Sequence, residues 1–234
     1  SVLAYEAGFK ASHAENSIQL NGAVFYYDYE DKQERGKIQD PIFGPLDALV
    51  NVPESTIVGV ETDIVALIGD HLTLSAAITY INSEVDKYVG YNVYGEIIDF
   101  SGESLPLTPD LTYSLDLDYR RPLAGGGTFF MGVNVVGQSS ADAVFNGDDI
   151  ALPADRIADG TAKSLTENYF RIDSYTTVGA RLGYLSENER WKLMLWGKNI
   201  TDEYYYNTVI AATESGARVA GRPATYGISI VYTY

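Results

Sequence analysis

The clearest pattern of hydrophobic and polar positions lies at the end of the chain, in residues 223–234. Tyr226, Ile228, Ile230, Tyr232 and Tyr234 alternate there with small or polar residues. Side chains two positions apart on a strand point to the same face, so this period predicts a strand with one apolar face. Aliphatic side chains lie between aromatic ones, a distribution typical of strands that face lipid between two interfacial girdles.

The same alternation recurs along the chain and predicts nine strands. Residues 111–120 show it most cleanly, with Leu111, Tyr113, Leu115, Leu117 and Tyr119 on one face. The predicted strands cover residues 1–11, 18–27, 58–64, 72–80, 111–120, 129–136, 171–184, 191–200 and 223–234.

Short turns and long polar segments alternate between these strands. The long segments are residues 30–55, 83–110, 139–168 and 201–222. Residues 30–55 are charged and contain three prolines, so they are predicted to form a long loop and not a tight hairpin. Short turns at one rim and long loops at the other are typical of bacterial outer-membrane barrels.

The strand length and the polar face also favour a membrane barrel. A strand of about 10 residues, at about 3.3 Å per residue and a tilt near 45°, reaches roughly 23 Å, close to the apolar band of such barrels. The polar face carries charges in mid-strand, at Glu61, Asp63, Asp116, Asp118, Arg120 and Arg181. These charges would be costly in a dry sandwich core but not in a wet lumen.

The predicted fold class is therefore all-β, an antiparallel transmembrane β-barrel. Single-chain bacterial barrels have an even number of strands with both ends in the periplasm. Nine strands predict that residues 1–234 are the C-terminal portion of a larger barrel, and that the partner of the first strand precedes Ser1.

Composition narrows the function classes. The net charge is −16 and the sequence pI is about 4.3, which argues against nucleic acid as a partner, because phosphate binding needs a basic face. The chain has no cysteine, so it can form neither disulfides nor cysteine-based metal or nucleophile sites. Its 19 tyrosines suit a membrane–water boundary.

Five short segments resemble motifs of the TonB-dependent outer-membrane receptors. They are YEAGFK at 5–10, GVETD at 59–63, LPLTP at 105–109, NITDEY at 199–204 and GRPATYG at 221–227. In the last motif the arginine precedes Pro223, whereas the family has it after the proline. Each motif alone is weak, but five in the family's order form a specific signal.

This resemblance implies a 22-stranded barrel with an N-terminal plug, of which the chain would supply about the last nine strands. It implies a ligand bound above the plug, usually a ferric siderophore and in some members a cobalamin, haem, sugar or nickel complex. The implied energy source is the TonB–ExbB–ExbD system. Lipid, lipopolysaccharide and the barrel assembly machinery, which would recognise the terminal aromatic Tyr234, are further implied partners in the outer membrane of a Gram-negative bacterium.

Candidate chemistry is sparse. Asp116 and Asp118 could be an acid–base pair of the glycosidase kind, but lumen-facing charges beside Arg120 need no catalytic explanation. Residues 146–149 lack the spacing of a calcium loop, and His13 and His71 fall in or near short turns. No catalytic residue, cofactor or metal ligand is predicted.

Aromatic and basic side chains on the long loops would ring the barrel mouth. They could stack on a ligand and neutralise its carboxylates or catecholates. For Tyr204, Tyr205 and Tyr206 an interfacial girdle is the favoured alternative. The predicted ligand-binding residues are Tyr88, Tyr91, Tyr94, Phe145, Arg156, Tyr169, Arg218 and Arg222.

Two functions lead the remaining candidates. The first is an active TonB-dependent transporter of a scarce nutrient, with a ferric siderophore as the expected ligand. The second is a passive or selective porin, which shares the girdles and the loop asymmetry but has no plug. A secreted sugar-binding sandwich is a third candidate, and it would be monomeric without detergent. An outer-membrane enzyme comes last, since no triad or well-spaced acid pair is found.

Overall fold

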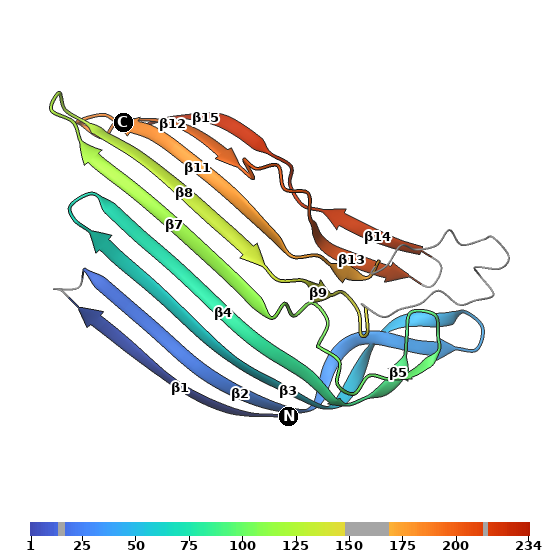
Figure 1. Cartoon of the computed structure of the whole chain (residues 1–234). Helices are drawn as coiled ribbons and strands as arrows, with labels where there is room; N and C mark the ends of the chain where they lie inside the picture. Colours follow the sequence, from blue (N-terminus) through green and yellow to red (C-terminus); the bar gives the residue numbers. More distant parts are fainter. Residues whose placement is uncertain (14–16, 148–168, 213–214) are drawn as a thin grey trace.

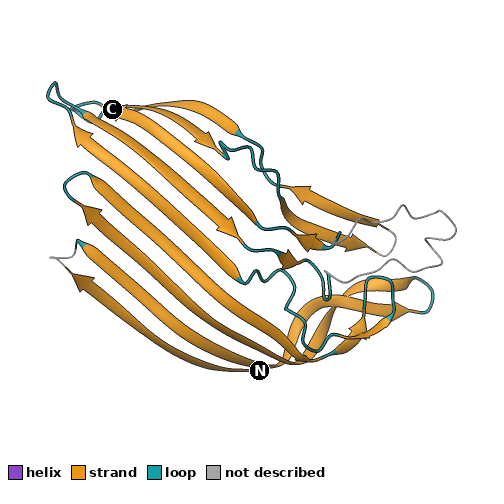
Figure 2. Ribbon diagram, in the orientation of Figure 1, coloured by secondary structure: helices purple, strands orange, loops and turns teal. Residues whose placement is uncertain are grey.

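The computed structural model describes residues 1–13, 17–147, 169–212 and 215–234. Every regular element in these residues is a strand (Figure 2), and none of them forms a helix that could span a membrane. The strands are β1 (Val2–His13), β2 (Ile18–Asp40), β3 (Gly44–Ile68), β4 (Leu72–Lys87), β5 (Val89–Tyr91), β6 (Ile97–Asp99), β7 (Leu111–Pro122), β8 (Thr128–Gln138), β9 (Ala141–Asp142), β10 (Arg171–Ile172), β11 (Tyr175–Leu185), β12 (Trp191–Lys198), β13 (Tyr206–Ala212), β14 (Ser215–Ala220) and β15 (Thr225–Tyr232).

The nine predicted strands are confirmed as one curved antiparallel wall (Figure 1). The order is β15-β12-β11-β8-β7-β4-β3-β2, with β1 paired to β2, so the long strands follow one another as a meander. Short turns lie at one rim of this wall and the long connections lie at the other (Figure 1). The predicted asymmetry between the rims is therefore present.

The register gathers apolar side chains on one face of the wall. Cross-strand partners share a face, and one row runs Tyr119, Met131, Leu182, Leu195 and Ile228 across β7, β8, β11, β12 and β15. Met131 is 48% exposed, Leu182 and Leu195 are 49% exposed and Ile228 is 72% exposed. A continuous exposed apolar surface of this kind fits contact with lipid.

The opposite face carries the predicted charges, and four of them form ion pairs. Arg181 donates from Nη2 to Asp116 Oδ1 at 3.1 Å and from Nη1 to Asp116 Oδ2 at 3.2 Å. Its Nη2 also lies 2.5 Å from Asp118 Oδ2, while Arg120 Nε donates to Asp118 Oδ1 at 2.9 Å. Ion pairing across the wall thus accounts for Asp116 and Asp118 without a catalytic role.

The prediction that residues 30–55 form a long loop is wrong. β2 and β3 stay paired beyond the wall as far as Asp40 and Gly44. Pro53 fits because it takes no part in the ladder: Glu30 pairs with Glu54 and Lys32 with Val52, and the pairing skips Pro53 and the opposite Asp31, which has a φ of 52°. At the tip, the amides of Phe43 and Ile42 donate to the Asp40 carboxylate, which holds its pKa below the ordinary value.

Two other predicted loops also contain strands. The end of β4 with β5 and β6 lies within residues 83–110, and β13 pairs with β14 within residues 201–222. Residues 139–168 contain β9, and most of that segment lies outside the described residues.

A tight turn after β12 ties two of the motif-bearing segments together. The buried Asn199, with a φ of 48°, donates from Nδ2 to the carbonyls of Glu203 and Arg222, each at 2.9 Å. Its Oδ1 accepts from the Glu203 amide at 3.0 Å, and Asp202 Oδ1 accepts from the Ala224 amide at 2.9 Å. The two ends of the connection between β12 and β15 are therefore joined at the wall.

We predict that the apolar face lies against lipid. Val133→Arg, in the middle of β8 on that face, should lower the free energy of unfolding by about 2–4 kcal/mol in lipid vesicles. Ser114→Arg, on the exposed polar face of β7, is the matched control and should change it by less than about 1 kcal/mol. Guanidinium titration of the intact receptor measures both, and equal losses would contradict the assignment of the faces.

Candidate functional site

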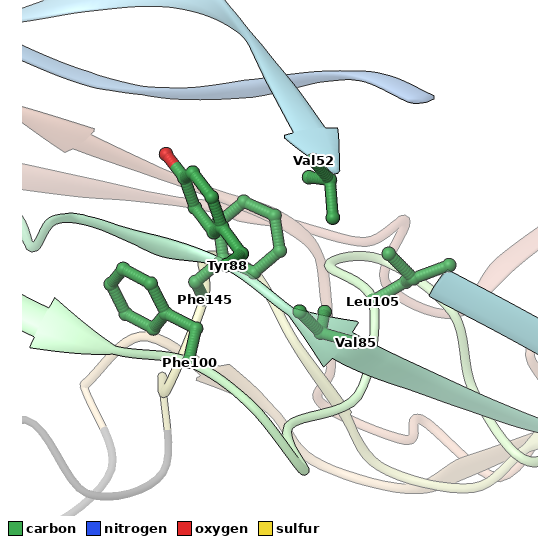
Figure 3. Close-up of a cluster of buried hydrophobic side chains, with 6 residues drawn as sticks. All are labelled: Val52, Val85, Tyr88, Phe100, Leu105 and Phe145. Carbon is green, nitrogen blue, oxygen red and sulfur yellow. The ribbon is translucent and has the colours of Figure 1, made fainter. Parts of the chain in front are cut away.

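The long connections gather at one rim and pack into a layer of their own (Figure 1). Six buried side chains form its first core: Val52, Val85, Tyr88, Phe100, Leu105 and Phe145 (Figure 3). The Tyr88 ring stacks on Phe100 at 5.4 Å between centroids, and Phe145 lies 5.3 Å from each of those two rings. Aromatic packing therefore holds the connection between β4 and β7 against the one after β9.

This layer folds over the polar face of the wall. Ser55 lies on the same face of β3 as Glu61, and Ser83 lies on the same face of β4 as Thr79. This is the polar face, and both serines are buried there. The Leu105 amide donates to Ser83 Oγ at 3.2 Å, which places residues of the long connection on top of that face. The long connection between β4 and β7 thus covers part of the polar face near the rim.

A second buried cluster links the remaining connections. Val93 follows β5, Phe170 and Ile172 lie at β10, and Val209 belongs to β13. Backbone bonds join the segments as well, since the Leu107 amide donates to the Asp142 carbonyl at 2.7 Å. The rim is therefore one packed unit and not a set of separate loops.

Arg218 joins β14 to the residues that precede β10, and we call Arg218 with Tyr169 and Tyr206 the Arg218 clip. Its guanidinium lies over the Tyr169 ring at 4.8 Å and over the Tyr206 ring at 4.9 Å, and its Nε donates to the Tyr169 carbonyl at 3.0 Å. The Tyr169 hydroxyl donates to the Gly216 carbonyl at 2.6 Å. A cation between two rings combines charge attraction with restricted geometry.

The clip also affects the neighbouring tyrosines. A hydrogen bond from Tyr204 and then the hydrogen bond and charge of Arg218 hold the pKa of Tyr206 below its ordinary value. The hydrogen bond to Tyr206, followed by the charge interaction between the two phenols, raises the pKa of Tyr204. These two side chains and Arg218 therefore act as one electrostatic unit at the base of β13.

A small cavity of about 120 Å³ lies where the long connections meet. Tyr91 contributes to its wall next to Lys37, its cross-strand partner. Lys37 Nζ lies 2.9 Å from Asp47 Oδ1, and Arg35 Nη2 lies 3.3 Å from Asp47 Oδ2. Burial alone raises the pKa of Asp47, but Lys37 and Arg35 outweigh it and the pKa lies below the ordinary value.

The predicted ligand-binding residues separate into groups. Tyr88 and Phe145 are each 6% exposed and belong to the first core, while Tyr94 packs on the second cluster. Tyr91 lines the cavity, Tyr169 and Arg218 form the clip, and Arg222 is exposed at the turn held by Asn199. Arg156 lies outside the described residues.

Arg35, Lys37 and Asp47 are polar cavity residues that the sequence did not single out. They lie in the segment that was predicted as an irregular loop, so their pairing across β2 and β3 could not be inferred. One signal was available: Lys32, Arg35 and Lys37 fall within six residues of a strongly acidic chain. Among the described residues no group of three His, Cys, Asp or Glu side chains could hold a metal ion.

The sequence itself matches a known family. Residues 2–200 match the family described as TonB dependent receptor-like, beta-barrel. The chain belongs to this family. The match covers most of the chain and confirms the resemblance inferred from the five motifs.

Solved TonB-dependent receptors share the fold. The siderophore receptor PiuA from Acinetobacter baumannii is 21% identical with a TM-score of 0.69, and the ferric yersiniabactin uptake receptor FyuA from Yersinia pestis is 17% identical with a TM-score of 0.70. The copper transporter OprC is 12% identical with a TM-score of 0.66. Each is matched over 100% of this chain, which spans only 28%, 30% and 31% of their respective lengths.

Removal of the Arg218 clip should loosen the β13–β14 hairpin of the receptor. Arg218→Gln loses both ring contacts, which are worth about 0.5–2 kcal/mol, so amide hydrogen exchange in β13 and β14 should accelerate by roughly 2- to 30-fold. The same change should raise the pKa of Tyr206, because a positive charge that favours the phenolate is lost. NMR of ring-labelled tyrosine measures this second effect.

Arg222→Gln is the matched control for the clip. The Arg222 side chain is exposed, and its backbone carbonyl, which Asn199 binds, is unchanged by the substitution. Unchanged exchange in Arg218→Gln, or equal acceleration in both variants, would show that the clip does not hold the hairpin.

Proposed function

We propose that the chain is part of a TonB-dependent outer-membrane receptor that actively takes up a scarce nutrient, with a ferric siderophore as the ligand class. The family match over residues 2–200 carries this proposal. The names of structural relatives, a siderophore receptor, a ferric yersiniabactin uptake receptor and a copper transporter, point to metals and metal chelates. The rim of packed connections, with aromatic and basic side chains, supports a ligand bound at that end of the barrel.

The cellular setting follows from the same proposal. The receptor lies in the outer membrane of a Gram-negative bacterium, with lipid and lipopolysaccharide against the apolar face. Residues 1–234 supply the C-terminal portion of its barrel domain, and the strand that ends at Tyr234 is the segment offered to the assembly machinery. Coupling to TonB–ExbB–ExbD takes place through a part of the receptor other than these 234 residues.

A passive porin is the alternative, and no enzymatic activity is proposed. Energy dependence separates the transporter from the porin. In a receptor-deleted strain with the whole gene restored, we expect growth on an iron chelate from a panel and accumulation of labelled iron. Deletion of tonB or addition of a protonophore should abolish accumulation, whereas undiminished uptake under both treatments would favour the porin.

Tyr91 and Tyr94 are the tyrosines of the β5–β6 region that we expect to affect ligand affinity. In the intact receptor, Tyr91→Ala combined with Tyr94→Ala should weaken binding of the transported chelate by about 10-fold or more, from lost aromatic contact. Ile97→Ala, in the same hairpin and 67% exposed, is the control and should change affinity less than about twofold. Unaltered affinity in the double variant would remove this loop from the site.

A further inference from the structure

Charged side chains are unevenly spread over the polar face of the wall, the face that we assign to the lumen. Carboxylates lie on this face of β3 and β7, whereas β8, β11, β12 and β15 contain neither Asp nor Glu. The cations of these four strands are Arg181, Lys192 and Lys198. This part of the wall is therefore positive, although the net charge of the chain is −16.

Two of the three cations lie together on the lumen face of β12. Arg181 is on that face and pairs across the strands with Trp196, so Lys192 and Lys198, at even-numbered spacings from Trp196, share it. The charge of Arg181 is matched by carboxylates of β7. Both lysines are exposed, and within the described ranges neither forms an ion pair. The positive charge of β12 is thus left unmatched by the wall.

Aromatic rings hold the two ammonium groups in place. Lys192 Nζ lies 5.3 Å from the centroid of the buried Phe130 ring, and Lys198 Nζ lies 5.7 Å from the centroid of the Trp196 ring. The indole is itself fixed, because its Nε1 donates to Ser229 Oγ at 3.0 Å. A ring attracts a cation through its quadrupole but carries no net charge, so each ammonium is positioned while its charge stays available.

The two lysines mark opposite ends of the lumen wall. Lys198 precedes the tight turn of Asn199 at the long rim, and Lys192 follows the short turn between β11 and β12. They are six positions apart, which at about 3.3 Å per residue is roughly 20 Å along the strand. Met194 and Trp196, which lie between them on the same face, are half-buried and carry no charge.

We propose that the lumen face of β12 is part of the path of an anionic solute through the barrel, and that Lys198 and then Lys192 attract this solute between the long rim and the short rim. The proposal rests on the proposed function, because the solute is the transported chelate, and it adds that this chelate has a net negative charge. A wall with charges of one sign concentrates ions of the opposite sign beside it. The carboxylates of β3 repel the same solute, so the β12 side of the lumen is favoured.

Uptake of radioactive iron by the restored strain tests this path, with the chelate of the panel that supports growth as the probe. Lys192→Gln combined with Lys198→Gln, the lumen variant, should lower the uptake rate at saturating chelate by at least about threefold, because the attraction for the anion is lost. The affinity of the purified receptor for the chelate should change less than about twofold, since distant exposed charges are screened. Lys192→Arg combined with Lys198→Arg keeps both charges and should preserve the rate.

Arg121→Gln combined with Lys87→Gln is the matched control. It removes two positive charges as well, but Arg121 lies on the apolar face of β7, and Lys87 pairs with Glu54 at the far end of β4. Heat-dependent migration in gels confirms that each variant is folded. Equal losses of uptake in the control and the lumen variant overturn the path, and so does a transported chelate without net negative charge.

Contact with another part of the receptor is the competing role of the two lysines. In that case their substitution would loosen the part that they touch, and amide hydrogen exchange in the N-terminal plug that the family resemblance implies would accelerate in the intact receptor. We expect exchange in the plug to be the same in the native receptor and the lumen variant. Slower uptake together with faster exchange in the plug overturns the path.

The failure of the path can be distinguished from the failure of the proposed function. TonB-dependent uptake at the native rate in the folded lumen variant overturns the path alone. A native receptor that takes up no chelate in a TonB-dependent way overturns the proposed function and, with it, the assignment of β12 to a transported solute.

Discussion

Backbone hydrogen bonding between adjacent strands is the constraint on which the rest of the structure depends. Within lipid an unpaired amide or carbonyl costs several kcal/mol, so a segment can cross only if its polar backbone is satisfied by its neighbours. Each strand of the wall between β1 and β15 meets this requirement with antiparallel partners on both sides, whereas in the described residues β1 is paired with β2 alone and β15 with β12 alone. Side chains are then free to differ between the faces, apolar toward lipid and charged toward the lumen.

Beyond the wall, a different interaction organises the chain. The connections at the long rim have water on one side, so their backbone can bond to solvent and does not need a continuous ladder. They are held instead by two small apolar cores, and Tyr88, Phe100 and Phe145 contribute the aromatic part of the first. The cavity at this rim is therefore bordered by packed cores, which fix the positions of lining residues such as Tyr91.

The wall could be predicted from the sequence because lipid and lumen impose opposite polarities on alternate residues. That contrast ends where both faces meet water, so the pattern disappears in residues 30–55 although β2 and β3 continue there. The same limit applies to the site. An aromatic residue in a polar segment could line a cavity, as Tyr91 does, or belong to a buried core, as Phe145 does. The two cases differ in which distant segments of the chain pack against the residue, and the local sequence does not contain that information.

The turn at Asn199 bears on how such a receptor can diversify. The Asn199 side chain donates to the carbonyls of both Glu203 and Arg222. It therefore joins the two ends of the connection between β12 and β15 without contacts from the residues in the middle of that connection. Insertions or deletions in the β13–β14 hairpin would then leave the registration of β12 with β15 untouched. Such a closed base lets the outer part of the hairpin change in length and sequence while the hydrogen bonds of the wall stay in place.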